Sequence, residues 1–94
     1  MIDRINKNER KLDSVLLSIK NLENAINEFK KNKKYIYDLN KYYGSKVWFK
    51  DKDNYENDKI PKVKAGVLSE DTIWNMNDDI KDLYKEMRDI INDN

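Results

Sequence analysis

The sequence predicts an all-α protein, in which a long amphipathic N-terminal helix and a shorter antiparallel C-terminal helix flank a short connecting segment. Two long stretches predict helices because their apolar residues recur at alternating spacings of three and four. The 94 residues include only two glycines and one proline, whereas turn-rich β folds need many more. We therefore expect a single domain, residues 1–94, folded as a helical hairpin or a three-helix bundle.

The first helix is predicted over about residues 3–43, where two apolar rows each repeat every seven residues. This spacing resembles the seam of a coiled coil, although Asn8 and Lys33 interrupt it. We expect a continuous helix about 60 Å long. A bend at the basic run 30–34 is the alternative. The rows consist of Ile5, Leu12, Ile19 and Ile26, and of Val15, Leu22, Phe29, Ile36 and Tyr43.

The connecting segment, residues 44–68, begins with two capping signals. Gly44 follows the last apolar position of the first helix and is its predicted left-handed cap. Ser45 is the predicted N-cap of a short helix that contains Trp48 and Phe49.

The rest of the connecting segment is expected to lack regular secondary structure. The polar run 51–59 should fray into a loop, and Pro61 disfavours a helix around it. Residues 67–68 should form an extended or turn segment. The acidic run resembles a calcium loop only in composition, because the glycine and the bidentate glutamate of an EF-hand are absent from their positions.

The last helix is predicted over about residues 70–92, with a length of about 33 Å. Ser69 is the predicted N-cap, and Glu70 and Asp71 lie in the first turn, where the helix dipole favours negative charge. These caps also explain the paired carboxylates better than an acid–base site does. The apolar face consists of Ile73, Met76, Ile80, Leu83, Met87 and Ile90.

The aromatic residues Trp48, Phe49 and Trp74 are expected to belong mainly to the core. We predict that Trp48 and Trp74 clamp the connecting segment onto the helix pair. Exposure of Trp48 or Phe49 would instead indicate contact with a partner, because aromatic side chains dominate interface hot spots.

The two long helices differ in length, so the shorter helix cannot cover the apolar rows of the longer one. Exposed apolar surface on this scale usually marks an interface. We predict association through the N-terminal half of the first helix, most simply as a two-fold homodimer. A monomer with a sharply bent first helix is the rival. The candidate interface residues are Ile5, Leu12, Val15, Leu16, Ile19, Trp48 and Phe49.

Composition argues against catalysis. Cysteine and histidine are absent, which removes disulfides, the common ligands of zinc, copper and iron, and the usual general base and thiolate nucleophile. We therefore predict no catalytic residue, no cofactor and no metal. A cytoplasmic protein is expected, because the N-terminus is charged where a signal peptide would be apolar and no run is long enough to span a membrane.

Charge is unevenly distributed, with a net +4 over residues 1–44 and a net −5 over residues 69–94. Lysines followed by tyrosines near the end of the first helix make nucleic-acid binding an alternative function, since ammonium groups neutralise phosphates and tyrosine rings stack on bases. Helical spacing spreads the lysines around the helix, which favours a solvated face instead. The candidates are Lys30, Lys31, Lys33, Lys34 and Lys41.

Two short motifs stand on either side of a tryptophan and a proline. The motif residues are Tyr42, Tyr43, Gly44, Ser45, Trp48, Pro61, Gly66, Leu68, Ser69, Glu70 and Asp71. These motifs are similar to those of an uncharacterised bacterial family, domain of unknown function 4298. The resemblance covers most of the chain and implies that the motifs belong together in one compact unit. From their residue types we expect them to be structural. The resemblance implies no activity, substrate or cofactor.

The leading hypothesis is a non-enzymatic protein–protein interaction module, of inhibitor, immunity or anti-defence type, that binds a larger partner or a second copy. The assignment to the inhibitor, immunity or anti-defence type rests only on an analogy of size and composition. Nucleic-acid binding is the second hypothesis. The third is a small anionic ligand at the turn 66–71, because a helix N-terminus presents free N–H groups. The adjacent carboxylates oppose a strongly anionic ligand there.

Overall fold

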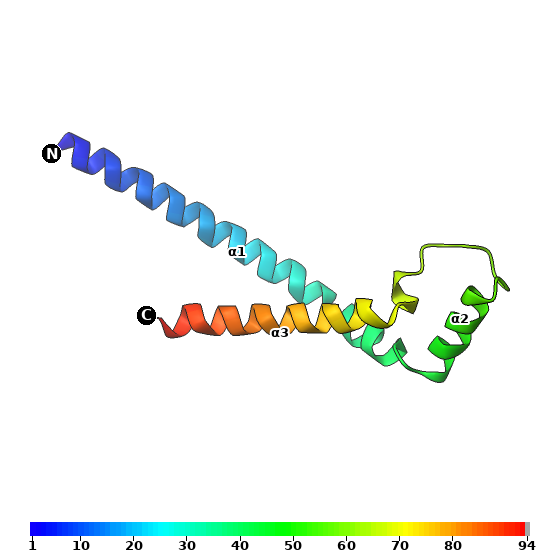
Figure 1. Cartoon of the computed structure of the whole chain (residues 1–94). Helices are drawn as coiled ribbons and strands as arrows, with labels where there is room; N and C mark the ends of the chain where they lie inside the picture. Colours follow the sequence, from blue (N-terminus) through cyan, green and yellow to red (C-terminus); the bar gives the residue numbers. More distant parts are fainter. Residues whose placement is uncertain (94) are drawn as a thin grey trace. The chain divides into compact units, whose positions relative to one another are not determined.

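The computed structural model describes residues 1–93 and confirms the all-α prediction (Figure 1). Helix α1 spans Ile2–Tyr42, α2 spans Lys46–Glu56, the short 3-10 helix η1 spans Gly66–Leu68, and α3 spans Glu70–Asn92. No strand occurs among the described residues. The chain divides into two compact units, Met1–Tyr35 and Ile36–Asn94.

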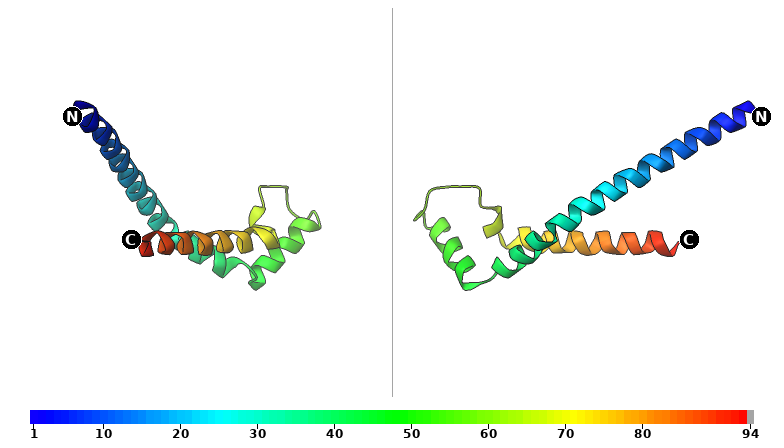
Figure 2. Two further views of the ribbon diagram at one scale, coloured as in Figure 1. Left: turned by 60° about the vertical axis from the view of Figure 1, so that its left-hand side comes forward. Right: turned by 180° about the vertical axis from the view of Figure 1, so that it is seen from behind.

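Helix α1 is uninterrupted over 41 residues, and both views in Figure 2 show it as one continuous ribbon. Helical structure continues through the basic run 30–34, where a bend was the alternative. Asp3 in the first turn and Lys41 in the last turn both have the sign that the helix dipole favours. The helix ends at Gly44, whose φ of 76° lies in the left-handed region, as predicted.

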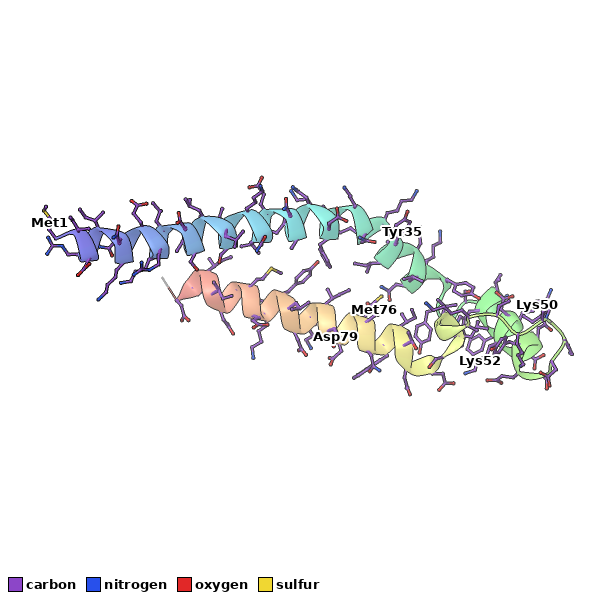
Figure 3. All side chains as sticks on the ribbon, turned by 90° about the horizontal axis from the view of Figure 1, so that it is seen from above. Met1, Tyr35, Lys50, Lys52, Met76 and Asp79 are labelled. Carbon is purple, nitrogen blue, oxygen red and sulfur yellow. The ribbon has the colours of Figure 1, made fainter. Side chains whose placement is uncertain are left out.

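The unit Met1–Tyr35 consists almost entirely of the N-terminal part of α1. No residue of α1 is buried. Figure 3, in which Met1 and Tyr35 mark the two ends of this unit, shows side chains projecting from it on all sides. The unit therefore has no core of its own.

Helix α2 starts at the predicted cap, because the hydroxyl of Ser45 accepts a hydrogen bond from the backbone N–H of Trp48 at 3.2 Å. The prediction that residues 51–59 fray into a loop was wrong for most of that run, since α2 continues to Glu56. Asn57 closes the helix: its backbone N–H and its side-chain amide both donate to the carbonyl of Asp53.

The segment after α2 is tied back to it by two contacts. The hydroxyl of Tyr55 donates to the carbonyl of Val63 at 3.3 Å, and the ammonium group of Lys62 donates to the carbonyl of Tyr55 at 2.8 Å. The predicted turn at residues 67–68 is present as the 3-10 helix η1, in which Leu68 N–H bonds to the carbonyl of Ala65.

Helix α3 also starts at its predicted cap, with the hydroxyl of Ser69 accepting from the N–H of Asp71 at 3.3 Å. Within the unit Ile36–Asn94, the start of α3 lies antiparallel to the end of α1. The hydroxyl of Tyr43 donates to the carbonyl of Glu70 at 2.9 Å, and the side-chain amides of Asn40 and Asn77 exchange two hydrogen bonds at 3.0 and 2.7 Å.

The core of this unit is small: Trp48 and Ile73, at 2% and 3% exposure, are the buried apolar residues of the described chain. Trp74 was expected in the core, but it is 62% exposed. The prediction fails because neighbouring residues of a helix point about 100° apart. With Ile73 directed inward, Trp74 is rotated toward solvent.

Candidate interaction surface

A row of exposed apolar side chains follows the N-terminal part of α1. Each member lies three, four or seven residues from another member, so the row follows one side of the helix. Each is between 41% and 58% exposed, and all five α1 residues predicted as interface candidates are among them. We call the following residues the apolar row: Ile5, Leu12, Val15, Leu16, Ile19, Leu22 and Ile26.

Helix α3 is too short to cover this row. Beyond Asn77 it extends about 22 Å, whereas α1 extends about 57 Å from Asn40 back to Ile2, at 1.5 Å per residue. The part of α3 beyond Asn77 is therefore less than half as long as the part of α1 that precedes Asn40. The length difference inferred from the sequence is therefore present, at 41 residues against 23.

Trp48 joins three segments of the unit Ile36–Asn94. Its indole N–H donates to the carbonyl of Val67 at 2.8 Å, and its ring packs edge-on against Tyr43 with centroids 5.0 Å apart. Of its two predicted roles, core and partner contact, this burial favours the core. Its neighbour Phe49 also contacts the indole edge-on, but it is 60% exposed, so the prediction that Phe49 belongs to the core was wrong. Phe49 remains a candidate for partner contact.

Tyr42 forms the shortest hydrogen bond described in this unit, donating its hydroxyl to the carboxylate of Asp51 at 2.6 Å. Burial, the hydrogen bond to Asp51 and the negative charge of that carboxylate raise the pKa of Tyr42 to about 12. The phenol therefore stays protonated at neutral pH and holds the end of α1 to α2. This is a structural contact rather than a proton-transfer site.

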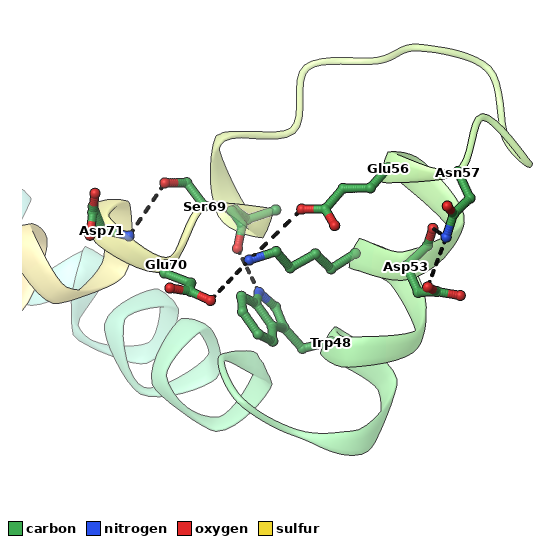
Figure 4. A network of polar contacts seen from close by, with 9 residues as sticks. Trp48, Asp53, Glu56, Asn57, Ser69, Glu70 and Asp71 are labelled. Carbon is green, nitrogen blue, oxygen red and sulfur yellow. Dashed lines mark hydrogen bonds and ion pairs between the residues drawn. The ribbon is translucent and has the colours of Figure 1, made fainter.

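Lys52 connects α2 to the start of α3 through ion pairs with Glu56 and Glu70, the two glutamates labelled in Figure 4. Its ammonium group lies 3.2 Å from Glu70 and 3.9 Å from Glu56, and 5.1 Å from the centre of the Trp48 ring. Both glutamates are mostly exposed, so each ion pair contributes less than about 1 kcal/mol. The ammonium group lies over the ring of the buried indole, which is the geometry of a cation–π contact.

The family-motif residues therefore act mainly as caps and packing contacts. Gly44, Ser45 and Ser69 end or start helices, and Tyr43 and Trp48 join the helices. Pro61 lies in the exposed segment between α2 and η1, and Leu68 is half-buried at the end of η1.

The turn 66–71 uses several of its own N–H groups internally. Those of Leu68 and Ser69 bond to backbone carbonyls, and that of Asp71 bonds to the Ser69 hydroxyl. The carboxylate of Glu70 pairs with the ammonium group of Lys52 at 3.2 Å. The chain itself thus accepts hydrogen bonds from three N–H groups of this turn, which disfavours an anion site there.

The lysine candidates are all exposed, and four of them, Lys30, Lys31, Lys33 and Lys34, lie in the first unit. Lys31 pairs with Glu28 at 3.3 Å. Lys41 belongs to the second unit. Tyr35 and Tyr37, which follow the lysine run, are both more than 60% exposed.

Sequence reasoning missed the reciprocal amide pair of Asn40 and Asn77. A usable signal existed, because Asn40 continues the seven-residue repeat of Ile5 and therefore occupies a position that faces a neighbouring helix. A polar residue at such a position calls for a polar partner. Asn77 itself carries no comparable signal.

Two general properties of the described chain bear on its class. No three Asp or Glu side chains of residues 1–93 gather closely enough to hold a metal ion. No helix within that range combines the length and the apolar character that crossing a bilayer requires.

These features define an all-α protein in which a capped, tryptophan-centred helical unit follows a long helix with an exposed apolar row. The chain belongs to the family described as Domain of unknown function (DUF4298), whose model matches residues 5–90. This match confirms the resemblance drawn from the motifs around Gly44 and Gly66. No curated protein and no solved structure matches the chain.

Proposed function

We propose that this protein is a non-enzymatic protein–protein interaction module whose binding element is the apolar row of α1. The observation that supports the proposal is the combination of seven half-exposed aliphatic side chains on one side of a helix with an α3 too short to cover them. Apolar surface of this extent on a soluble helix is typical of an interaction site.

The energetics favour an amphipathic helix as the binding counterpart. Fully burying an exposed Val, Leu or Ile yields about 1.5–3 kcal/mol, so covering the exposed half of each member of the row yields roughly 1 kcal/mol. Across seven residues this is comparable to the cost of association, which is about 4–15 kcal/mol. A partner must therefore follow most of the row, as a helix packed along α1 does.

An inhibitor, an immunity protein or an anti-defence protein that covers a site on a larger protein would use such a surface. Phe49, exposed on α2, offers a second and smaller contact in the other unit. The proposal assigns no catalytic group to either surface.

Affinity capture from a lysate of the native host tests the proposal. The intact chain, Leu12→Lys and Leu17→Lys are compared as baits. Leu17 is a matched control, since it is 60% exposed but lies outside the row. Proteins, including differently tagged copies of this chain, should be retained by the parent and by Leu17→Lys, and lost with Leu12→Lys. Equal retention by all three baits would contradict the proposal.

Nucleic-acid binding is the second candidate, favoured by one observation: Tyr35 is exposed beside the exposed lysines of the first unit. An exposed ring is available for stacking on a base. If this function holds, the parent should bind single-stranded RNA or DNA at low salt, and this binding should weaken as the salt concentration rises. Charge reversal at Lys30, Lys31, Lys33 and Lys34 should abolish that binding. Absence of binding by the parent at low salt would end the hypothesis.

A further inference from the structure

We infer that the occupant of the apolar row is a second copy of this chain, aligned parallel and in register over Ile5–Ile26 as a two-stranded coiled coil. This inference rests on the proposed function, because it names the partner of the same surface. It is carried by the residue types along the seam and by the charges that flank it.

The seam has the residue pattern of a two-stranded coiled coil. Numbering the heptad from Ile5, its first core position holds Ile5, Leu12, Ile19 and Ile26 in turn. Isoleucine at three of these four positions, together with Leu22 at the second core position, is the combination that favours two strands in parallel coiled coils, whereas Leu12 and Val15 depart from it. All these side chains are accessible, at 41–58% exposure, and α1 is helical throughout this range.

The one polar interruption of the seam is Asn8. In a parallel, in-register pair, Asn8 faces Asn8 of the second copy, and the two side-chain amides are able to hydrogen-bond to each other. In an antiparallel pair with fully overlapping rows, Asn8 would instead face Ile26. That arrangement would bury an amide without a partner, which is costly.

The flanking charges distinguish the two orientations in the same way. In the parallel pair, Arg4 lies beside Glu9 of the second copy, once on each side of the seam. The other flanking pairs of the parallel arrangement contain no two like charges. In the antiparallel pair, Glu9 would lie beside Glu23 of the second copy, which is repulsive.

The seam has a natural end before Lys33. This residue occupies the core position that follows Ile26 in the repeat, so a parallel pair that continued this far would bring two ammonium groups together. We therefore confine the paired region to residues 5–26.

Light scattering coupled to size-exclusion chromatography tests self-association of the full chain. At tens of micromolar the parent should have twice the monomer mass of 11.3 kDa. Leu12→Lys and Ile19→Lys should reduce this to the monomer mass, and Leu17→Lys should leave the dimer intact. Amide NMR signals of α2 and α3 should be retained in each variant, which separates lost association from lost folding. A parent that is monomeric at this concentration overturns the inference.

Cross-linking tests the parallel alignment, and the absence of native cysteine makes it specific. In the parallel pair, Asn8→Cys places two thiols at facing core positions, within the Cα separation of about 4.4–6.8 Å that a disulfide needs. In the antiparallel pair the two positions would lie roughly 27 Å apart. Mild oxidation should therefore convert Asn8→Cys to a covalent dimer, while the outward-facing Arg10→Cys stays uncross-linked. If the protein is a dimer in solution but oxidation of Asn8→Cys yields no covalent dimer, the parallel alignment is overturned.

Charge exchange tests the flanking pairs. Arg4→Glu and Glu9→Arg should each weaken the dimer several-fold at low salt, and the double exchange should restore most of the lost affinity. Additive weakening in the double variant would contradict the assigned contacts.

The outcomes also separate this inference from the proposed function. A monomeric parent that still captures another protein through Leu12 overturns the second copy as occupant and leaves the interaction module standing. A chain that neither self-associates nor captures any protein through Leu12 removes both.

Discussion

At the scale of single residues, Trp48 is buried whereas its neighbours Val47 and Phe49 are exposed. It is 2% exposed, hydrogen-bonded to Val67 and packed against Tyr43. Trp48→Ala should reduce the free energy of unfolding by about 3–5 kcal/mol, because it empties the centre of a small core. Urea denaturation followed by circular dichroism measures the change. Phe49→Ala is the matched control and should cost only about 1 kcal/mol.

Tyr42 makes the stability of the protein depend on pH in the alkaline range. Its pKa is raised from the usual 10.0 to about 12, so the contribution of its hydrogen bond to Asp51 is complete below pH 10. That contribution is lost as the pH rises from 10 to 12. Tyr42→Phe should therefore be less stable than the parent by about 1 kcal/mol at pH 8. The difference should vanish by about pH 12.

Urea titrations of both proteins at several pH values check this expectation. Tyr37→Phe, at an exposed tyrosine of the same helix, should change stability by less than about 0.5 kcal/mol at pH 8. A constant difference between the parent and Tyr42→Phe up to pH 12 would show that the hydroxyl is not held by Asp51.

At the scale of elements, the boundary between α1 and α2 depends on Gly44. A Cβ added there meets no atom within 4 Å, but the φ of 76° strains any other side chain. Gly44→Ala should thus destabilise the protein by about 1–2 kcal/mol through backbone strain alone. Gly66→Ala is the control, because that position also has open space and lies outside the left-handed region. It should be neutral or slightly stabilising, and thermal unfolding of both variants checks the pair.

Much of the element structure was predictable because local chemistry determines it. Gly44, Ser45 and Ser69 were assigned as caps from residue type and position, and each is a cap. Seven-residue spacing alone predicted the length of α1, since an amphipathic pattern needs no information about neighbours.

The errors have tertiary causes. The end of α2 was predicted as a loop, but Tyr55 and Lys62 tie it to the following segment, and Asn57 closes its last turn. Trp74 was predicted as core on hydrophobicity alone. The rotation of α3 that exposes Trp74 accompanies the pairing of Asn77 with Asn40, and the sequence carries a signal for this pair at Asn40 but none at Asn77.

At the scale of the whole molecule, two unlike units share one chain. The hydrogen bonds described above between residues that are far apart in the sequence all lie within Ile36–Asn94. The unit Met1–Tyr35 has no buried residue. If a second copy covers the apolar row, association and folding are linked, and the midpoint of thermal unfolding must depend on concentration.

A hundredfold increase in protein concentration, from about 5 to 500 µM, should stabilise the associated state by about 2.7 kcal/mol. The melting temperature of the parent should rise by several degrees, since 1 kcal/mol corresponds to roughly 2–8 °C in proteins of this size. Leu12→Lys should melt at the same temperature at both concentrations. Scanning calorimetry measures both melting temperatures. A melting temperature of the parent that does not change with concentration would contradict the coupling of association to folding.

The opposite environments of the two tryptophans also give the protein a built-in optical probe. Trp48 is enclosed and Trp74 is open to solvent, so the emission has a shielded and an accessible component. Iodide should quench about half of the emission in the folded chain and nearly all of it after denaturation in urea. The Stern–Volmer plot should accordingly curve downward before unfolding and become linear afterwards, without any attached dye.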